Sequence, residues 1–165
     1  VDDRIRGAVA LSAPIDLSAA ATQIDRWSNW HYTQYFLRSL RQKMRTKARQ
    51  HPSRVSARHL RRIHSLRGFD DAYTAPLHGF DGAEDYYRRA SSRPLLPDLA
   101  VPTLLLNAAN DPFLPPSCYP RTVARGHEPL TLEVPTSGGH VGFVSFNADG
   151  EYWSESRTTS FLSPS

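Results

Sequence analysis

Two side chains that follow predicted β-strands have the chemistry of a catalytic acid–base pair. Asp111 comes directly after the apolar run 103–109, and His140 follows the run 130–134 through a glycine-rich loop. Ligands of open α/β sheets bind at the carboxyl edge of the strands, so we expect both side chains at one edge. A carboxylate can orient an imidazole, which then removes the proton of a serine hydroxyl. The pair therefore predicts two members of a Ser–Asp–His triad, in the chain order of the α/β-hydrolases.

The nucleophile of such a triad is not recognisable in this sequence. No Gly-x-Ser-x-Gly motif occurs among the 165 residues. Ser12 ends the first apolar run without flanking glycines, and Ser137 lies too close to His140 to follow the usual chain order. We expect the nucleophile to lie outside this chain, and the chain alone to be inactive. Two simpler interpretations stay open: Asp111 as the start of a turn before Pro112, and His140 as an ordinary loop histidine.

Other reactive side chains give weaker signals. Cys118 is the only cysteine, which excludes an internal disulfide and a cysteine cluster for zinc or iron–sulfur, and we expect a buried thiol. Asp70 and Asp71 are expected in helix-capping or turn roles. The remaining histidines have no spacing typical of a metal site; they are His31, His51, His59, His64, His78 and His127. We expect no cofactor and no metal.

The elements that must position the pair are three apolar runs, 7–13, 103–109 and 130–134, which predict β-strands. The first two runs are almost continuously apolar, which is typical of parallel strands covered on both faces. About 90 residues of helical character separate them. Strands that alternate with helices favour an α/β fold with right-handed crossovers.

Helical periodicity is clearest between positions 27 and 50. Apolar residues recur there every three to four positions, at Trp27, Trp30, Phe36, Leu37, Leu40 and Met44. This stripe has two interpretations, a packing face of the helix or the lining of an acyl-chain pocket. The pattern further predicts helices over 56–66, 82–90 and 153–162, and a loop over 65–73.

The charge distribution is strongly asymmetric. The net charge is +4, but twelve Arg or Lys and no Asp or Glu occur between Arg26 and Phe69. This basic segment is either the solvated face of an inserted helical region or a surface for an anionic partner, nucleic acid or lipid headgroups. No apolar run approaches the length of a membrane span, and no signal-peptide pattern is visible. These features favour a cytoplasmic protein, with peripheral membrane contact through the basic segment as a further option.

Several segments together resemble the YheT-type branch of the α/β-hydrolases, which is related to eukaryotic abhydrolase-domain lipases. The resemblance covers most of the chain and is carried by VALSAPIDL (9–17), YFLRSLRQK (35–43), FDDAYTAP (69–76), GFDGAEDYYRRA (79–90), VPTLLLNAANDPFLP (101–115), GGHVGFV (138–144) and Trp153. It implies that Asp111 and His140 are the charge-relay acid and base. It also implies a larger sheet, of which the three predicted strands are the last three.

The resemblance assigns residues 1–165 to the C-terminal part of an α/β-hydrolase domain, with a helical cap insertion over residues 15–93. The function it implies is a serine carboxylesterase or lipase that acts on small-molecule or lipid-like esters, with no nucleic-acid partner. The alternative, based on the charge distribution, is a non-catalytic basic module that binds nucleic acid or an anionic membrane.

Overall fold

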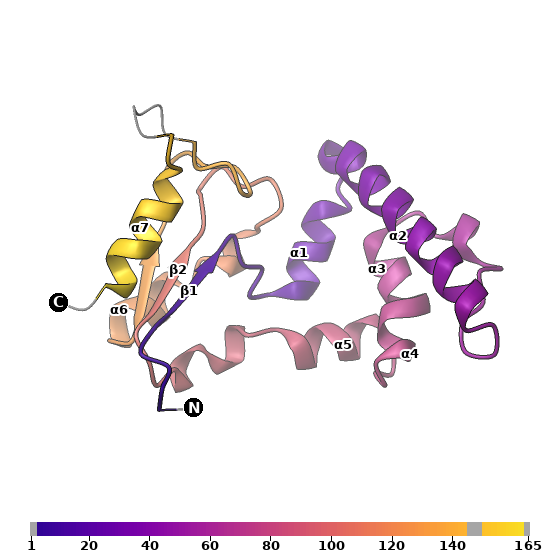
Figure 1. Ribbon diagram of the computed structural model, residues 1–165, viewed down its shortest axis with the longest axis horizontal. Helices are drawn as coiled ribbons and strands as arrows, with labels where there is room; N and C mark the ends of the chain where they lie inside the picture. Colours follow the sequence, from indigo (N-terminus) through magenta and orange to yellow (C-terminus); the bar gives the residue numbers. More distant parts are fainter. Residues whose placement is uncertain (1–2, 145–149, 164–165) are drawn as a thin grey trace. The chain divides into compact units, whose positions relative to one another are not determined.

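Three short apolar runs form a parallel sheet, as the sequence predicts. In the computed structural model, which describes residues 3–144 and 150–163, the strands are β1 (Ala8–Leu11), β2 (Thr103–Leu106) and β3 (Leu130–Glu133) (Figure 1). β2 lies in the middle and pairs in parallel with both neighbours, with the first residues of all three strands side by side. Each strand is shorter than its apolar run, although backbone hydrogen bonds continue just beyond the strand ends, from Ser12 N to Leu106 O and from Asn107 N to Glu133 O.

Both faces of the sheet are covered, which explains the nearly continuous apolar sequence of β2. Alternate side chains of a strand point to opposite faces, so Leu105 enters one core while Leu104 and Leu106 enter another. Helix α6 (Arg121–Gly126) contributes to the Leu105 core through Val123 and Ala124. Helix α7 (Trp153–Leu162) covers the other face through Phe161 (Figure 1). The predicted helix over 153–162 is therefore confirmed.

The chain divides into two compact units. The sheet unit consists of Val1–Asp16 with Ser91–Ser165, and the helical unit is Leu17–Ala90. Besides α6 and α7, the sheet unit has two 3₁₀ turns, Arg93–Asp98 and Pro116–Cys118. The helical unit contains α1 (Leu17–Ile24), a 3₁₀ turn (Trp27–Asn29), α2 (Trp30–Gln50), a 3₁₀ turn (Leu60–Arg62), α3 (Leu66–Phe69), a π-helical turn (Asp70–Thr74), α4 (Ala75–Leu77) and α5 (Ala83–Ala90). None of the helices in the described ranges is long and apolar enough to cross a membrane.

Helix α2 follows the predicted periodicity only in part. Leu37 and Met44 are buried and pack within the helical unit against other residues of that unit: Val55, Leu60, Ile63, Phe69 and Tyr73. Trp27 and Trp30 belong to the same sequence stripe, but they are 85% and 44% exposed. These two tryptophans therefore take no part in the core of the helical unit that Leu37 and Met44 join.

Two predicted elements between positions 56 and 73 are also wrong. The expected helix over 56–66 is reduced to the 3₁₀ turn at 60–62, and the expected loop over 65–73 is helical. Ser65 caps this helix by accepting a hydrogen bond from Gly68 N, and the carboxylate of Asp25 accepts from Leu66 N and Arg67 N at 2.8 and 3.2 Å. Asp25 is about forty positions away in the sequence, so this capping is tertiary and no local pattern predicts it.

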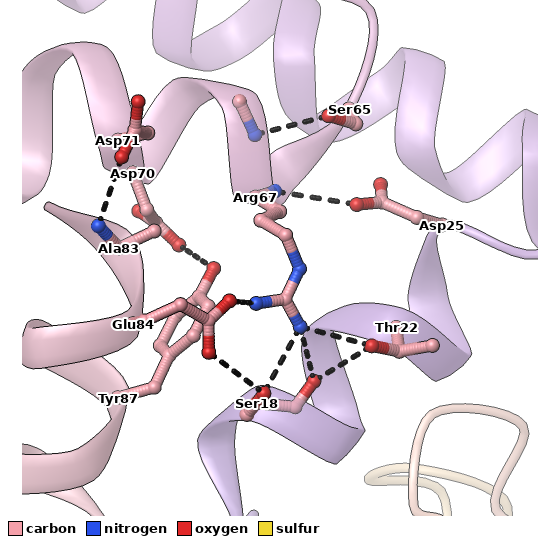
Figure 2. A network of polar contacts seen from close by, with 11 residues as sticks. Ser18, Thr22, Asp25, Ser65, Arg67, Asp70, Asp71, Ala83, Glu84 and Tyr87 are labelled. Atoms are coloured by element: carbon pink, nitrogen blue, oxygen red, sulfur yellow. Dashed lines mark hydrogen bonds and ion pairs between the residues drawn. The ribbon is translucent and has the colours of Figure 1, made fainter.

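A polar network around Arg67 joins three helices of the helical unit (Figure 2). The guanidinium forms an ion pair with Glu84 of α5 and donates to Ser18 O and Thr22 Oγ1 of α1, each at 2.9 Å. It also lies over the ring of Tyr87, 5.0 Å from the centroid. Because one planar group satisfies acceptors on two helices, Arg67 fixes α3 against α1 and α5.

Of the acidic pair 70–71, Asp71 has the predicted capping role, whereas Asp70 lies inside a helical turn and accepts hydrogen bonds from side chains instead. Asp70 accepts hydrogen bonds from Tyr87 OH at 2.7 Å and from Thr74 Oγ1 at 2.6 Å. Asp71 accepts from Ala83 N at 3.1 Å and so caps the first turn of α5 (Figure 2). Burial, together with the hydrogen bond to Asp70, raises the pKa of Tyr87.

Candidate active site

The loop after β2 holds the Asp111 carboxylate in a buried position. The backbone of Asp111 donates to Ala108 O at 3.2 Å, and its Oδ1 accepts from Phe113 N at 2.8 Å, which closes a tight Asx turn. The side chain is fully buried. Tyr119 supports the start of this loop by donating its hydroxyl to Ala108 O at 2.7 Å. Burial and the nearby Asp111 carboxylate raise the pKa of Tyr119, so its phenol stays neutral and remains a donor.

Asn107, the first residue after β2, ties the end of this strand to its neighbours. Its side chain is completely buried, where an unpaired amide would be costly. Oδ1 accepts from Ala13 N at 3.0 Å, and Nδ2 donates to Ala13 O and to Cys118 O at 3.3 and 3.0 Å. Asn107 therefore fixes the exits of β1 and β2 relative to each other at the edge where Asp111 lies.

The loop after β3 depends on glycine to bring His140 to the same edge. A Cβ on Gly138 would lie 2.5 Å from the ring of Phe143 and 2.9 Å from Ala108, so no larger residue fits. Gly139 has a φ of 58°, in the left-handed region that glycine adopts without strain, and its N–H donates to Asn110 Oδ1 at 2.9 Å. This hydrogen bond links the loop after β2 directly to the loop that carries His140.

The two predicted residues meet. Nδ1 of His140 lies 2.9 Å from Oδ2 of Asp111, and the imidazole side chain is 36% exposed while the carboxylate is inaccessible. In a neutral imidazole that donates from Nδ1 to this carboxylate, Nε2 is the acceptor nitrogen. The ring of Phe113 contacts the imidazole edge to face, with centroids 4.9 Å apart. Among the described residues, the imidazole ring is held by the hydrogen bond between Nδ1 and Asp111.

Ser12 lies at the end of β1, close to the pair. Its hydroxyl donates to the backbone carbonyl of His140 rather than to the imidazole, and its side chain is buried. This contact places Ser12 as a support of the histidine loop and not as a nucleophile that His140 could activate. Ser137 is exposed.

The remaining reactive groups form no second centre. Cys118 is buried, as expected, and burial raises the pKa of its thiol, which keeps it protonated and unreactive. Among the residues that the structure describes, no group of three or more His, Cys, Asp or Glu side chains could hold a metal ion. An open depression of about 420 Å³ lies beside the Asp111 loop and is lined by Ala109, Leu114, Pro116, Tyr119, Arg121 and Val134.

Sequence reasoning predicted that Asp111 and His140 lie together and that Ser12 lies near them. It missed three residues that hold the two loops, Asn107, Asn110 and Phe113. The run Asn107-Ala108-Ala109-Asn110-Asp111 does carry a signal, because two amides flank the strand exit and Asn favours turns. The sequence around Ser12 carries no signal of its contact with the His140 carbonyl, since a single serine at a strand end is common.

Comparison with known proteins identifies relatives of the chain. It is 31% identical to YheT of Escherichia coli K12, a protein named as a candidate esterase, over 96% of this chain and 47% of that protein. It is 28% identical to human phospholipase ABHD3 over 85% of this chain and 34% of that protein. It is 33% identical to the monoacylglycerol lipase of Saccharomyces cerevisiae, over 61% of this chain and 22% of that protein. The chain therefore spans about half the length of YheT and less of the other two. No protein-family model matches the chain, and no solved structure matches it.

Proposed function

This chain belongs to the YheT-type, abhydrolase-domain branch of the α/β-hydrolases, and we propose that it supplies Asp111 and His140 to the Ser–Asp–His triad of a carboxylic ester hydrolase. The observation that carries the proposal is the 2.9 Å contact between Asp111 Oδ2 and His140 Nδ1 at the carboxyl edge of a parallel sheet. The nucleophilic serine and the oxyanion donors then come from a part of the fold outside these 165 residues. On this proposal the chain alone is inactive.

Each residue of the pair has a definite task in such a reaction. Asp111 accepts a hydrogen bond from the Nδ1–H group of His140 and thereby keeps Nε2 directed at the incoming serine hydroxyl. Nε2 of His140 takes the serine proton as the hydroxyl attacks the ester carbonyl, and returns it to the leaving alcohol. The buried Asp111 stabilises the imidazolium that forms between these two steps, since its carboxylate is shielded from water.

We propose a lipid-like ester as the substrate class. Two of the relatives are named a phospholipase and a monoacylglycerol lipase, and both names describe enzymes that act on acyl esters of glycerol derivatives. The depression beside the Asp111 loop has apolar walls at Leu114 and Val134, which suit an acyl group. The helical unit, Leu17–Ala90, lies between β1 and β2 in the sequence, and on this proposal it belongs to the cap insertion expected over residues 15–93.

The proposal is tested by replacing His140 in a protein that joins this chain to the hydrolase segment with the serine. His140→Ala should lower kcat for p-nitrophenyl butyrate by at least about a thousandfold, since the serine then lacks its base. His78→Ala is the matched control, because His78 is exposed in the helical unit and should leave turnover unchanged. A fluorophosphonate should label the control and spare His140→Ala. Undiminished hydrolysis by His140→Ala would remove the pair from the mechanism.

A further inference from the structure

The outward face of α2 carries a row of side chains that the fold of the helical unit does not use. Tyr35, Arg38, Arg45 and Arg49 are all exposed, and their spacing of three, seven and four residues places them on one side of the helix. The opposite side carries the buried Leu37 and Met44, which anchor α2 in its own unit. The exposed row is therefore held at the surface by the packing of the other side.

The charge of this face is uniformly positive. Of the twelve basic residues between Arg26 and Phe69, two serve the fold: Arg41 donates to Leu60 O and Ile63 O, and Arg67 is the centre of the polar network. Arg38, Arg45 and Arg49, with Lys43 and Lys47, form no ion pair with any described residue. A cluster of cations without a nearby acid attracts an anionic surface over a Debye length.

Large aromatic side chains gather at the N-terminal end of the same helix. Trp27 is 85% exposed and Tyr35 is 71% exposed, and Trp30 and Tyr32 are exposed between them. The rings of Trp27 and Trp30 lie 6.1 Å apart and so form one apolar patch. Exposed apolar patches of this kind mark binding sites, and tryptophan and tyrosine are the residues that concentrate at the interface between a bilayer and water.

We propose that this surface, Trp27, Trp30, Tyr35, Arg38, Arg45 and Arg49, docks the protein on an anionic phospholipid bilayer. The aromatic rings enter the headgroup region, and the arginine side chains contact lipid phosphates. Amphipathic helices that lie at a membrane interface bind in the same way. Nucleic acid fits less well, because a backbone-binding groove needs cations along its whole path and rings that stand between them. On α2 the rings lie at one end and the cations follow at the other.

The inference goes beyond ester hydrolysis, although a bilayer would be the natural location of a lipid-like ester. It can be tested without any turnover, so its failure would leave the proposed triad untouched. Failure of the proposed triad would likewise leave the membrane proposal untouched, because vesicle binding by the chain does not depend on whether His140 acts as a base.

The experiment measures co-sedimentation of the 165-residue chain with vesicles. The chain should bind vesicles that contain phosphatidylserine and should not bind vesicles of phosphatidylcholine alone. Raising the salt concentration from about 0.1 M to about 1 M shortens the Debye length from about 10 to about 3 Å and should release most of the protein. Arg38→Glu/Arg45→Glu should weaken binding at least tenfold. Arg6→Glu/Arg125→Glu, which changes the net charge equally at exposed positions of the sheet unit, is the matched control and should bind normally.

Tryptophan emission separates a bilayer from the other possible occupants of this face. Binding to phosphatidylserine vesicles should shift the emission to shorter wavelength, and Trp27→Phe should reduce that shift. The proposal is overturned if the folded chain does not sediment with these vesicles at low salt, or if the charge reversal on α2 has no more effect than its control. Tighter binding to duplex DNA than to vesicles, without an emission shift, would assign the face to nucleic acid. If the 165-residue chain binds vesicles but a longer protein that contains it does not, this face of α2 contacts another part of the hydrolase instead.

Discussion

The hydroxyl of Ser12 donates a hydrogen bond to the backbone carbonyl of His140, although 128 positions separate the two residues. The backbone N–H of Ser12 donates to Leu106 O at 2.9 Å, so Ser12 links the exits of β1 and β2 to the histidine loop. Its φ of 50° lies in the left-handed region, which disfavours a residue with a Cβ. A strained residue persists only where the surrounding contacts outweigh the strain, and here those contacts hold the loop of the candidate base.

Replacing Ser12 should separate the hydrogen bond from the backbone strain. Ser12→Ala is expected to lower the free energy of unfolding by about 1–2 kcal/mol, because the partly buried carbonyl of His140 loses its donor while the strained φ remains. Ser12→Gly loses the same bond but adopts a positive φ freely, so its loss should be smaller by about 1 kcal/mol. Urea unfolding of both variants measures the difference. A larger loss for glycine than for alanine would show that the strain plays no part.

Arg67 should be irreplaceable by lysine in the helical unit. Lysine keeps the charge but loses the planar fork that reaches Glu84, Ser18 and Thr22 together (Figure 2). We expect Arg67→Lys to lower the free energy of unfolding by about 2 kcal/mol. Arg61→Lys, at an exposed position of the same unit, is the control and should change it by less than about 0.5 kcal/mol. Equal effects of the two variants in urea unfolding, followed by circular dichroism, would contradict the assigned role.

Tyr87 should make stability sensitive to alkaline pH. Burial and the hydrogen bond to Asp70 raise the pKa of Tyr87 above the ordinary value of 10.0, so the folded state favours the neutral phenol. The unfolded state ionises first, which means that this stabilisation is complete below about pH 10 and is lost as the pH rises further. Tyr87→Phe should cost about 1 kcal/mol at neutral pH. It should also flatten the fall in unfolding free energy above pH 10, and an unchanged slope would rule out Tyr87 as its source.

The sequence predicted the parts of the fold that local patterns determine. Continuous apolar runs identified all three strands, and the order of acid and histidine identified the pair that meets at their ends. The sequence did not predict the features that depend on contacts between distant parts of the chain. The start of the helix at 66–69 is capped by the local Ser65 and also by Asp25, about forty positions away, and only the first of these caps lies in the local sequence. The support of His140 by Ser12 depends on the adjacency of two loops, which no local pattern records.

The most direct test of the proposed triad is the tautomer of His140, measured by ¹⁵N NMR on the labelled chain. The contact with Asp111 requires the neutral ring to carry its proton on Nδ1, which leaves Nε2 as the acceptor. Asp111→Asn should move the proton to Nε2, because the amide can donate to Nδ1. A wild-type His140 with its proton on Nε2, unchanged in Asp111→Asn, would contradict the assignment of the two residues as acid and base.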